Sequence, residues 1–255
     1  MTSLQDQLFK RLNFEKHTEV KFEELSTMLF AFAHTIPFEN LDVIAGNTNE
    51  ISKENLQKKI LTSSRGGLCY ESNTLFYYFL KDCGFNAQLA LGTVYKNDIN
   101  AWALEDGHIT IIINFDNETY LIDVGIASLV PLVPVPFSGQ PVSSKNGMYR
   151  VRRKDTSKGN YVLERMDVDE EWKVCHAFYN HVIDESIVNE VQKKVIEDEK
   201  SIFNKGPIAV KLTDSGHVSL TNTSLTEIIY GEKSKREITG NQYRELLHSL
   251  FNIEL

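Results

Sequence analysis

Apolar residues recur at helical spacing through the first third of the chain. The pattern predicts an amphipathic helix over residues 4–12 and a second over 22–35. The second helix must end before Pro37, because proline disfavours helical backbone in the residue that precedes it. Residues 37–41 are then predicted to form a loop. Ser52 is a suitable N-cap for a third helix that runs to Leu61. A fourth helix is expected from Cys69 to Cys83, since Gly84 is a good C-terminal stop.

The middle third changes to runs of β-branched and apolar residues, which are typical of strands. Strands are predicted at residues 87–95, 108–115, 119–124, 148–154, 161–166 and 171–178. Asp116 and Asn117 supply turn chemistry between the second and third of these strands. The proline-rich stretch 131–141 is predicted to be an irregular crossing loop. Consecutive antiparallel strands of this length indicate a small barrel or a curled sheet.

The last third of the chain contains both helical spacing and strand-like runs. A helix is predicted over residues 185–198, followed by a hairpin of strands 208–212 and 218–220 around Ser215-Gly216. Thr239 can cap a final helix. The changes of period place the boundaries between three parts near residues 85 and 185.

Composition narrows the class of protein. The 255 residues are 42% hydrophobic and 24% charged, which is ordinary for a soluble globular protein. A net charge of −8 argues against a general nucleic-acid binder. Three cysteines make neither a disulfide framework nor a zinc-ligand spacing. The polar N-terminus and the lack of a membrane-spanning apolar run lead us to expect a cytoplasmic protein with reduced thiols and no membrane contact.

One of the cysteines stands in an unusual local sequence, Arg65-Gly66-Gly67-Leu68-Cys69-Tyr70-Glu71. The two glycines allow a tight bend and a close approach of a ligand. A cysteine at a helix start faces unpaired N–H groups and the positive end of the helix dipole, and both favour the nucleophilic thiolate. The same sequence also suits a small buried hydrophobic residue, which most free cysteines are.

A nucleophilic cysteine needs a base and a group that orients the base. A two-residue turn at Asp116-Asn117 would pair residue 110 with residue 123 and residue 108 with residue 125. His108 and Asp123 would then be diagonal neighbours on one face of an antiparallel hairpin. An odd loop length would place them on opposite faces.

The remaining polar candidates are weaker. His34, His217 and His248 are predicted to be structural. His176 and His181 lie near Cys175 and could form a second site, but no carboxylate at a comparable hairpin position supports it, so they too are predicted to be structural. No pair of cysteine or histidine residues has the spacing of metal ligands, so no metal is expected. Arg65 and Glu39 each flank an apolar segment, and we hypothesise that they form a buried ion pair that fixes the loop before Cys69. The alternative is two solvated surface charges.

Together these residues resemble the arylamine N-acetyltransferase family. Pro37-Phe38-Glu39-Asn40-Leu41 is similar to the family's P-F-E-N-L element, and residues 65–71 fit its R-G-G-x-C-x-E signature. His108 and Asp123 stand where the other members of the family's triad fall. The resemblance implies an α+β fold with a cysteine-protease-like Cys-His-Asp arrangement. Its three parts would be a helical bundle (1–85) carrying Cys69, an antiparallel β-barrel (86–185) carrying His108 and Asp123, and a small α/β lid (186–255).

The resemblance also implies a reaction. Cys69 would accept an acetyl group from acetyl-CoA and pass it to an arylamine, hydrazine or arylhydroxylamine in a ping-pong mechanism without a metal. His108 would move protons and Asp123 would hold its ring. The expected substrate contacts are Phe38, Gly125, Ile126 and Ala127, and the expected supports of the site are Arg65, Glu39, Gly66 and Gly67. Ile126 and Ala127 replace the family's usual Phe and Gly, which adds a Cβ and removes a large apolar surface beside the site.

Two other classes of function share some of these features. A Cys-His-Asp hydrolase or a transglutaminase-like acyl transferase has the same order of residues along the chain. A relative that binds a small molecule without turnover would keep the fold. The P-F-E-N-L and R-G-G-x-C-x-E elements favour the acetyltransferase over the first class, and the intact Cys69, His108 and Asp123 argue against the second.

Overall fold

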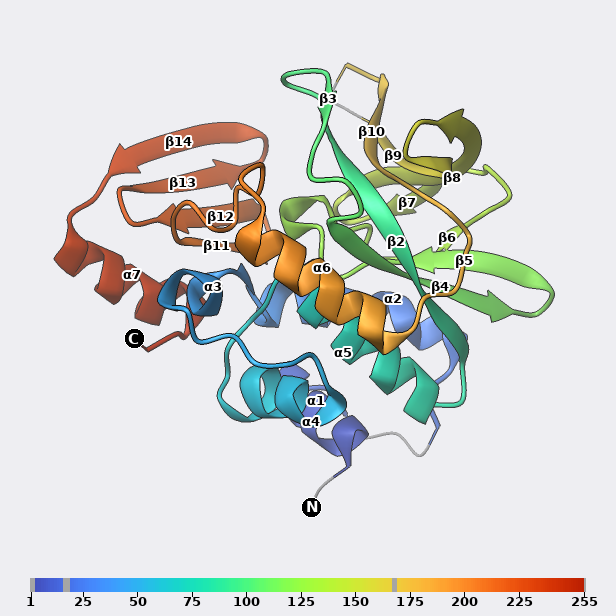
Figure 1. Cartoon of the computed structure of the whole chain (residues 1–255), viewed down its shortest axis with the longest axis horizontal. Helices are drawn as coiled ribbons and strands as arrows, with labels where there is room; N and C mark the ends of the chain where they lie inside the picture. Colours follow the sequence, from blue (N-terminus) through green and yellow to red (C-terminus); the bar gives the residue numbers. More distant parts are fainter. Residues whose placement is uncertain (1–2, 16–18, 167–168, 255) are drawn as a thin grey trace.

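The computed structural model describes residues 3–15, 19–166 and 169–254, and the first part of the chain is mainly helical (Figure 1). It contains α1 (Leu4–Leu12), α2 (Leu25–Thr35, after a 3-10 turn at Phe22–Glu24), α3 (Leu41–Ala45), α4 (Lys53–Leu56, continued by a π-helical turn at Gln57–Thr62) and α5 (Cys69–Asp82). Ser52 caps α4 through the backbone N–H of Asn55, as predicted. No helix in the described ranges is long and apolar enough to cross a membrane.

The middle of the chain is an antiparallel sheet that curls into a nearly closed barrel. Its strands are β2 (Asn86–Lys96), β3 (Ala101–Trp102), β4 (His108–Phe115), β5 (Glu118–Ile122), β6 (Val135–Pro136), β7 (Val142–Ser144), β8 (Gly147–Thr156), β9 (Gly159–Met166) and β10 (Trp172–Phe178). They follow the order β6-β5-β4-β2-β10-β9-β8-β7, and β3 pairs with β2 outside this path. Together with the helices, this sheet confirms the predicted α+β class.

The last part combines a second sheet with two helices (Figure 1). It contains α6 (Glu185–Glu197), β11 (Ile208–Thr213), β12 (Gly216–Thr221), β13 (Ser224–Ile229), β14 (Glu232–Glu237) and α7 (Gly240–Phe251). The order in the sheet is β1-β11-β12-β13-β14, where β1 (Phe38–Glu39) comes from the N-terminal part and pairs Phe38 with Val210. The strand β1, from the N-terminal side of the predicted boundary at residue 185, therefore belongs to the sheet on its C-terminal side. The three-part division stays a prediction.

Several short elements differ from the expectation. Residues 37–41 were expected to be a loop but contain β1 and the start of α3, because β11 offers backbone partners to Phe38 and Glu39. The expected irregular loop 131–141 contains β6, which pairs with β5. The strands β3, β7, β13 and β14 were not predicted. Three of them are very short or exposed throughout, so they lack an alternating apolar pattern.

The β4–β5 hairpin has the expected register. Ile111 pairs with Ile122, and Phe115 pairs with Glu118 across a two-residue turn. Asp116 and Asn117 both have positive φ, at 48° and 62°, as this kind of tight turn requires. Ladder pairing ends at Ile122, so that Asp123 follows directly after the strand.

Candidate active site

Cys69 is the first residue of α5 and lies on a bend made by two glycines. A Cβ atom on Gly66 would lie 1.9 Å from the carbonyl oxygen of Pro37, so the bend requires glycine there. The Cys69 side chain is buried, and its Sγ lies 3.5 Å from the carbonyl oxygen of Gly107. The backbone N–H of Cys69 has no hydrogen-bond acceptor among the described residues, so this group is free at the helix N-terminus.

His108 and Asp123 meet as the hairpin argument predicts. His108 Nε2 lies 2.6 Å from Asp123 Oδ2, and both side chains are buried. The other oxygen of Asp123 accepts hydrogen bonds from Asn73 Nδ2 at 3.0 Å and from the backbone N–H of Gly125 at 2.8 Å. The carboxylate is therefore fixed on both sides, and His108 keeps its second ring nitrogen for other contacts.

The charged forms of His108 and Asp123 stabilise each other against the effect of burial on their pKa values. Burial alone would lower the pKa of His108, but Asp123, and then the Cys69 thiol, offset this and raise the pKa to about 10. Burial would likewise raise the pKa of Asp123, but the charge and hydrogen bond of His108 hold it well below its usual range. The pair is thus an imidazolium and a carboxylate at neutral pH.

Asn73 is a contact residue whose role was not predicted. Its Nδ2 donates to the carbonyl oxygen of Ile109 at 2.7 Å as well as to Asp123, and its Oδ1 accepts from the N–H of Val124 at 2.9 Å. One buried amide thus joins α5 to β4 and to the segment after β5. Its position one helical turn after Cys69, on the same helix face, could have identified Asn73 as a site residue from the sequence.

His176 also lies beside the pair, although it was predicted to be structural. Its ring centroid is 4.7 Å from that of His108, and its Nε2 is 3.4 Å from Asp123 Oδ2. Burial, together with the nearby His108 charge, lowers the pKa of His176, so this ring stays neutral. The pairing of β10 with β2 brings His176 here, whereas His181 is exposed and stacks on Tyr179.

The ligand atoms of His108, Asp123 and His176 all lie within 4.8 Å of one another. A tetrahedral zinc ion would hold its ligand atoms about 3.3 Å apart. The 2.6 Å separation of His108 Nε2 and Asp123 Oδ2 is too short for two ligands of one metal and is instead that of a strong hydrogen bond. These atoms are therefore arranged to bind each other rather than a metal.

Arg65 and Glu39 form the hypothesised ion pair. Arg65 Nε lies 3.0 Å from Glu39 Oε1, and the fully buried carboxylate also accepts from the N–H groups of Leu41 and Gly66. Arg65 Nη1 reaches Asp42 Oδ1 at 3.0 Å. This network connects β1 to the bend that precedes Cys69, while Gly67 forms a bridge with Phe38.

The segment after Asp123 packs directly on the cysteine. A Cβ on Gly125 would lie 2.7 Å from Cys69 Cα, and Ile126 is buried. Ala127 has a φ of +49°, a conformation better suited to the glycine of the family pattern. Phe38 is half-buried and meets Phe203 edge-on, with 5.6 Å between the ring centroids. Gly125 thus adjoins Cys69 directly, Ile126 and Ala127 follow it in the chain, and Phe38 packs on the segment between α6 and β11.

Comparison with known proteins gives consistent matches over nearly the whole chain. A family model described as N-acetyltransferase matches residues 21–255. An uncharacterized acetyltransferase of Bacillus subtilis is 36% identical over 246 residues, which cover 95% of each chain. The crystal structure of arylamine N-acetyltransferase C from Bacillus anthracis has a TM-score of 0.96 and 47% identity, with 99% of each chain covered.

An arylamine N-acetyltransferase from Bacillus cereus is similar to the same degree. It has a TM-score of 0.96 and 49% identity, and the match covers 100% of both chains. That enzyme has a Cys-His-Glu catalytic triad. In the chain described here, the carboxylate that meets His108 belongs to Asp123.

Proposed function

Since the chain belongs to the arylamine N-acetyltransferase family, we propose that it transfers the acetyl group of acetyl-CoA to an arylamine, hydrazine or arylhydroxylamine through a thioester on Cys69. The observation that carries this proposal is the hydrogen-bonded pair of His108 and Asp123 beside a cysteine at a helix N-terminus. A cytoplasmic location, where acetyl-CoA and reduced thiols are both present, fits this chemistry.

The first half-reaction loads the cysteine. The Cys69 thiolate attacks the thioester carbonyl of acetyl-CoA, the bond from that carbon to the CoA sulfur breaks, and the departing sulfur takes a proton from the His108 imidazolium. The free backbone N–H of Cys69 is suited to hold the negative oxygen that forms in between. One thioester replaces another, so the acetyl group keeps its reactivity.

The second half-reaction unloads the cysteine. The amine nitrogen of the acceptor attacks the acetyl carbon, and His108, now neutral, takes the proton that the nitrogen loses. The Cys69 thiolate then leaves, which restores the starting ion pair. Asp123 stabilises the imidazolium and fixes its ring, because both carboxylate oxygens are engaged by hydrogen bonds.

The other thiols are unsuited to the reaction. Burial raises the pKa of Cys83 to about 11 and that of Cys175 to about 12, so both remain thiols at neutral pH. Acetylation of the protein should therefore occur at Cys69 alone.

Intact-protein and peptide mass spectrometry after incubation with acetyl-CoA tests the proposal. We expect one acetyl group on Cys69, no label in Cys69→Ala, slow labelling in His108→Gln and normal labelling in the matched control Cys175→Ala. Adding an arylamine or a hydrazine should then remove the label. Failure of any acetyl-enzyme or free CoA to form would refute the transferase.

Peptide cleavage is the corresponding test for the hydrolase alternative. Incubating the purified protein with a peptide mixture and acetyl-CoA together should give acetyl transfer without new peptide ends. Cleavage that disappears in Cys69→Ala would reverse the assignment, because the same triad serves both kinds of chemistry.

A further inference from the structure

Glu71 is the last residue of the R-G-G-x-C-x-E signature, and the proposed proton transfers do not use it. It is buried and lies two residues after Cys69, in the first turn of α5. Its Oε2 accepts a hydrogen bond from the backbone N–H of Leu68 at 3.0 Å, which forms part of a capping box at the start of the helix. A Cβ on Gly67 would lie 2.8 Å from the Cβ of Glu71, so the second glycine of the bend leaves room for this side chain.

The backbone of Leu68 is held on both sides. Glu71 binds its N–H, and its carbonyl oxygen accepts from the N–H groups of Glu71 at 3.1 Å and Ser72 at 2.9 Å. That carbonyl shares a trans peptide group with the N–H of Cys69, so the two point in opposite directions. The bonds that hold Leu68 therefore set the direction of the free Cys69 N–H.

Lys59 holds the other oxygen of the Glu71 carboxylate. Its Nζ lies 2.6 Å from Glu71 Oε1 and 2.9 Å from Asp42 Oδ2. Its side chain is only 16% exposed, so water screens this contact weakly. Lys59 lies on the π-helical turn Gln57–Thr62, and turns of this rare kind are frequent at functional sites.

Lys59 and Glu71 stabilise each other's charged form against the effect of burial. Burial raises the pKa of Glu71, and the charge and hydrogen bond of Lys59 offset part of that rise. Burial would lower the pKa of Lys59, but the nearby carboxylates, with Glu71 the strongest, outweigh burial and raise it. Lys59 is therefore a cation at neutral pH, and it favours the carboxylate form of Glu71 that accepts from Leu68.

We propose that Lys59 is a positioning residue for acyl transfer, which acts through the Glu71 carboxylate to direct the Cys69 N–H at the oxyanion. The inference rests on the proposed function, in which that N–H holds the negative oxygen. Without the cation, the carboxylate loses the partner of its Oε1 and can turn away from Leu68, so the start of α5 is held less firmly. A misplaced oxyanion donor slows acyl transfer, although the thiolate is still present.

Two reactions of Cys69 test the proposal, because only one of them forms an oxyanion. Acylation by acetyl-CoA or 4-nitrophenyl acetate passes through a tetrahedral oxyanion, whereas alkylation by iodoacetamide displaces iodide at a saturated carbon. In single turnovers followed by mass spectrometry, Lys59→Met should slow both acylations about tenfold, less than the roughly hundredfold effect of losing a whole oxyanion donor. Alkylation should stay within about twofold, because it needs only the thiolate.

A double-mutant cycle shows whether Lys59 acts through Glu71. Glu71→Gln alone should slow acylation about threefold, because the amide oxygen can still accept from the Leu68 N–H but its neutral charge weakens the bond. In that background, Lys59→Met should add less than about twofold. A full effect of Lys59→Met in that background would overturn the proposal. So would an unchanged ratio of acylation to alkylation in Glu71→Gln, a result that counts even if Lys59→Met does not fold.

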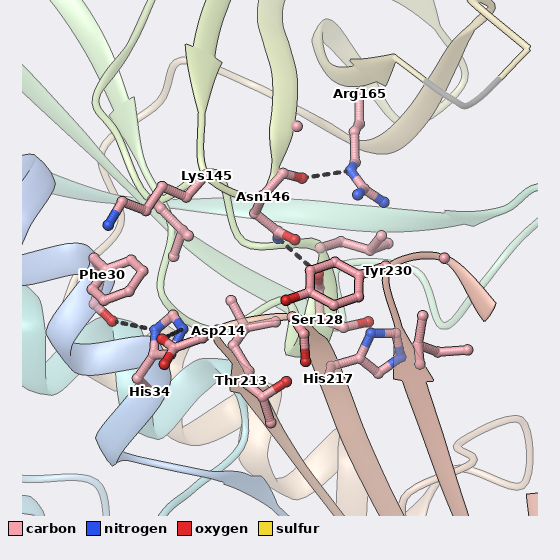
Figure 2. A pocket seen from close by; sticks show the side chains of 18 residues that line it. Phe30, His34, Ser128, Lys145, Asn146, Arg165, Thr213, Asp214, His217 and Tyr230 are labelled. Carbon is pink, nitrogen blue, oxygen red and sulfur yellow. Dashed lines mark hydrogen bonds and ion pairs between the residues drawn. The ribbon is translucent and has the colours of Figure 1, made fainter. Parts of the chain in front are cut away.

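Two other lysines provide matched controls. Lys53 Nζ lies 2.7 Å from Asp82 Oδ1 at the opposite end of α5. Lys145 Nζ lies 4.3 Å from the centroid of the Phe30 ring, at a pocket of about 790 Å³ between α2, the barrel and the last sheet (Figure 2). Cys69 is not part of the wall of that pocket. Lys53→Met and Lys145→Met should change neither acylation nor alkylation.

The remaining outcomes separate this inference from the proposed function. Equal slowing of acylation and alkylation in Lys59→Met would make Lys59 a structural residue and overturn the inference. Acylation by 4-nitrophenyl acetate needs no CoA, so it still tests Lys59 if acetyl-CoA fails to label Cys69. That failure would refute the proposed function instead.

Discussion

At the scale of single residues, the protonation of His108 is the property on which the proposed chemistry depends. Its pKa is raised above the ordinary 6.5 to about 10, so the ring should remain an imidazolium through neutral pH and lose its proton only as the pH rises past that value. NMR of the histidine ring nitrogens between pH 6 and pH 11 measures this directly. In Asp123→Asn the same loss should move to lower pH, because the carboxylate that offsets burial is gone.

Asp123→Glu is the matched control for that titration, since it keeps the negative charge. Its His108 signal should still titrate well above pH 6.5. A His108 ring that titrates near 6.5 in the unmodified protein would contradict the expected ion pair.

His176 offers a second test at this scale. His176→Phe keeps a ring against His108 and Phe178 but removes the nitrogen that faces Asp123. We expect the rate of Cys69 acetylation, measured in a single turnover, to fall by a factor of about five, which corresponds to about 1 kcal/mol. The melting temperature should change little. An unchanged rate would make His176 a space-filling residue.

The sequence predicted some of these residues and missed others for a physical reason. His108 and Asp123 share one hairpin, and a two-residue turn fixes which residues face each other. Asn73 and His176 reach the same carboxylate from α5 and β10, and the order of strands in the barrel, which brings β10 beside β2, cannot be read from the local pattern.

At the scale of elements, the ion pair between Arg65 and Glu39 holds the bend before α5. Arg65→Met should lower the free energy of unfolding by about 3 kcal/mol, because a fully buried carboxylate loses its main partner. Urea unfolding measures this change. In a Glu39→Gln background the same substitution should cost much less, since the remaining group is neutral.

Arg152→Met is the control for Arg65→Met. Arg152 is half exposed and shares Glu164 with Arg150, so its loss should cost less than about 1 kcal/mol. An equal loss of unfolding free energy in Arg65→Met and Arg152→Met would contradict the special role of the ion pair between Arg65 and Glu39.

Long elements were predictable and short ones were not. The helices at Leu4–Leu12 and Cys69–Asp82 and the strand His108–Phe115 have enough residues to show a period. The strand Phe38–Glu39 has two residues, and it exists because β11 lies next to it. The Ser224–Ile229 and Glu232–Glu237 hairpin was missed because its outer strand is exposed at every position.

At the scale of the molecule, Asn40 joins the first and last parts of the chain. Its Nδ2 donates to the carbonyl oxygens of Phe203 and Gly206, and its Oδ1 accepts from the N–H of Ile208. Asn40→Ala should therefore speed amide exchange along β11 and lower the free energy of unfolding by about 2 kcal/mol. Hydrogen-exchange mass spectrometry of peptides from residues 203–213 would show this change.

Asn204→Ala is the control for Asn40, because the acceptors of its amide within the described residues are nearby carbonyl oxygens, those of Ile196 and Asp198. It should leave exchange in β11 nearly unchanged. Equal amide exchange in β11 in the two variants would mean that Asn40 does not hold the first and last parts of the chain together. The change of period along the sequence predicts a division into three parts, but it gives no sign of this junction, because the junction joins residues more than 160 positions apart.

The pairing of β1 with β11 also has a consequence for how the protein is made. Phe38 and Glu39 leave the ribosome long before their partners Val210 and Ala209 are translated. The bend that carries Cys69 is bound to β1 through Gly67 and Glu39, and the other edge of β1 can find its partner strand only after most of the chain has been synthesised. The nascent chain thus carries its nucleophile early and completes the sheet next to the nucleophile's bend late.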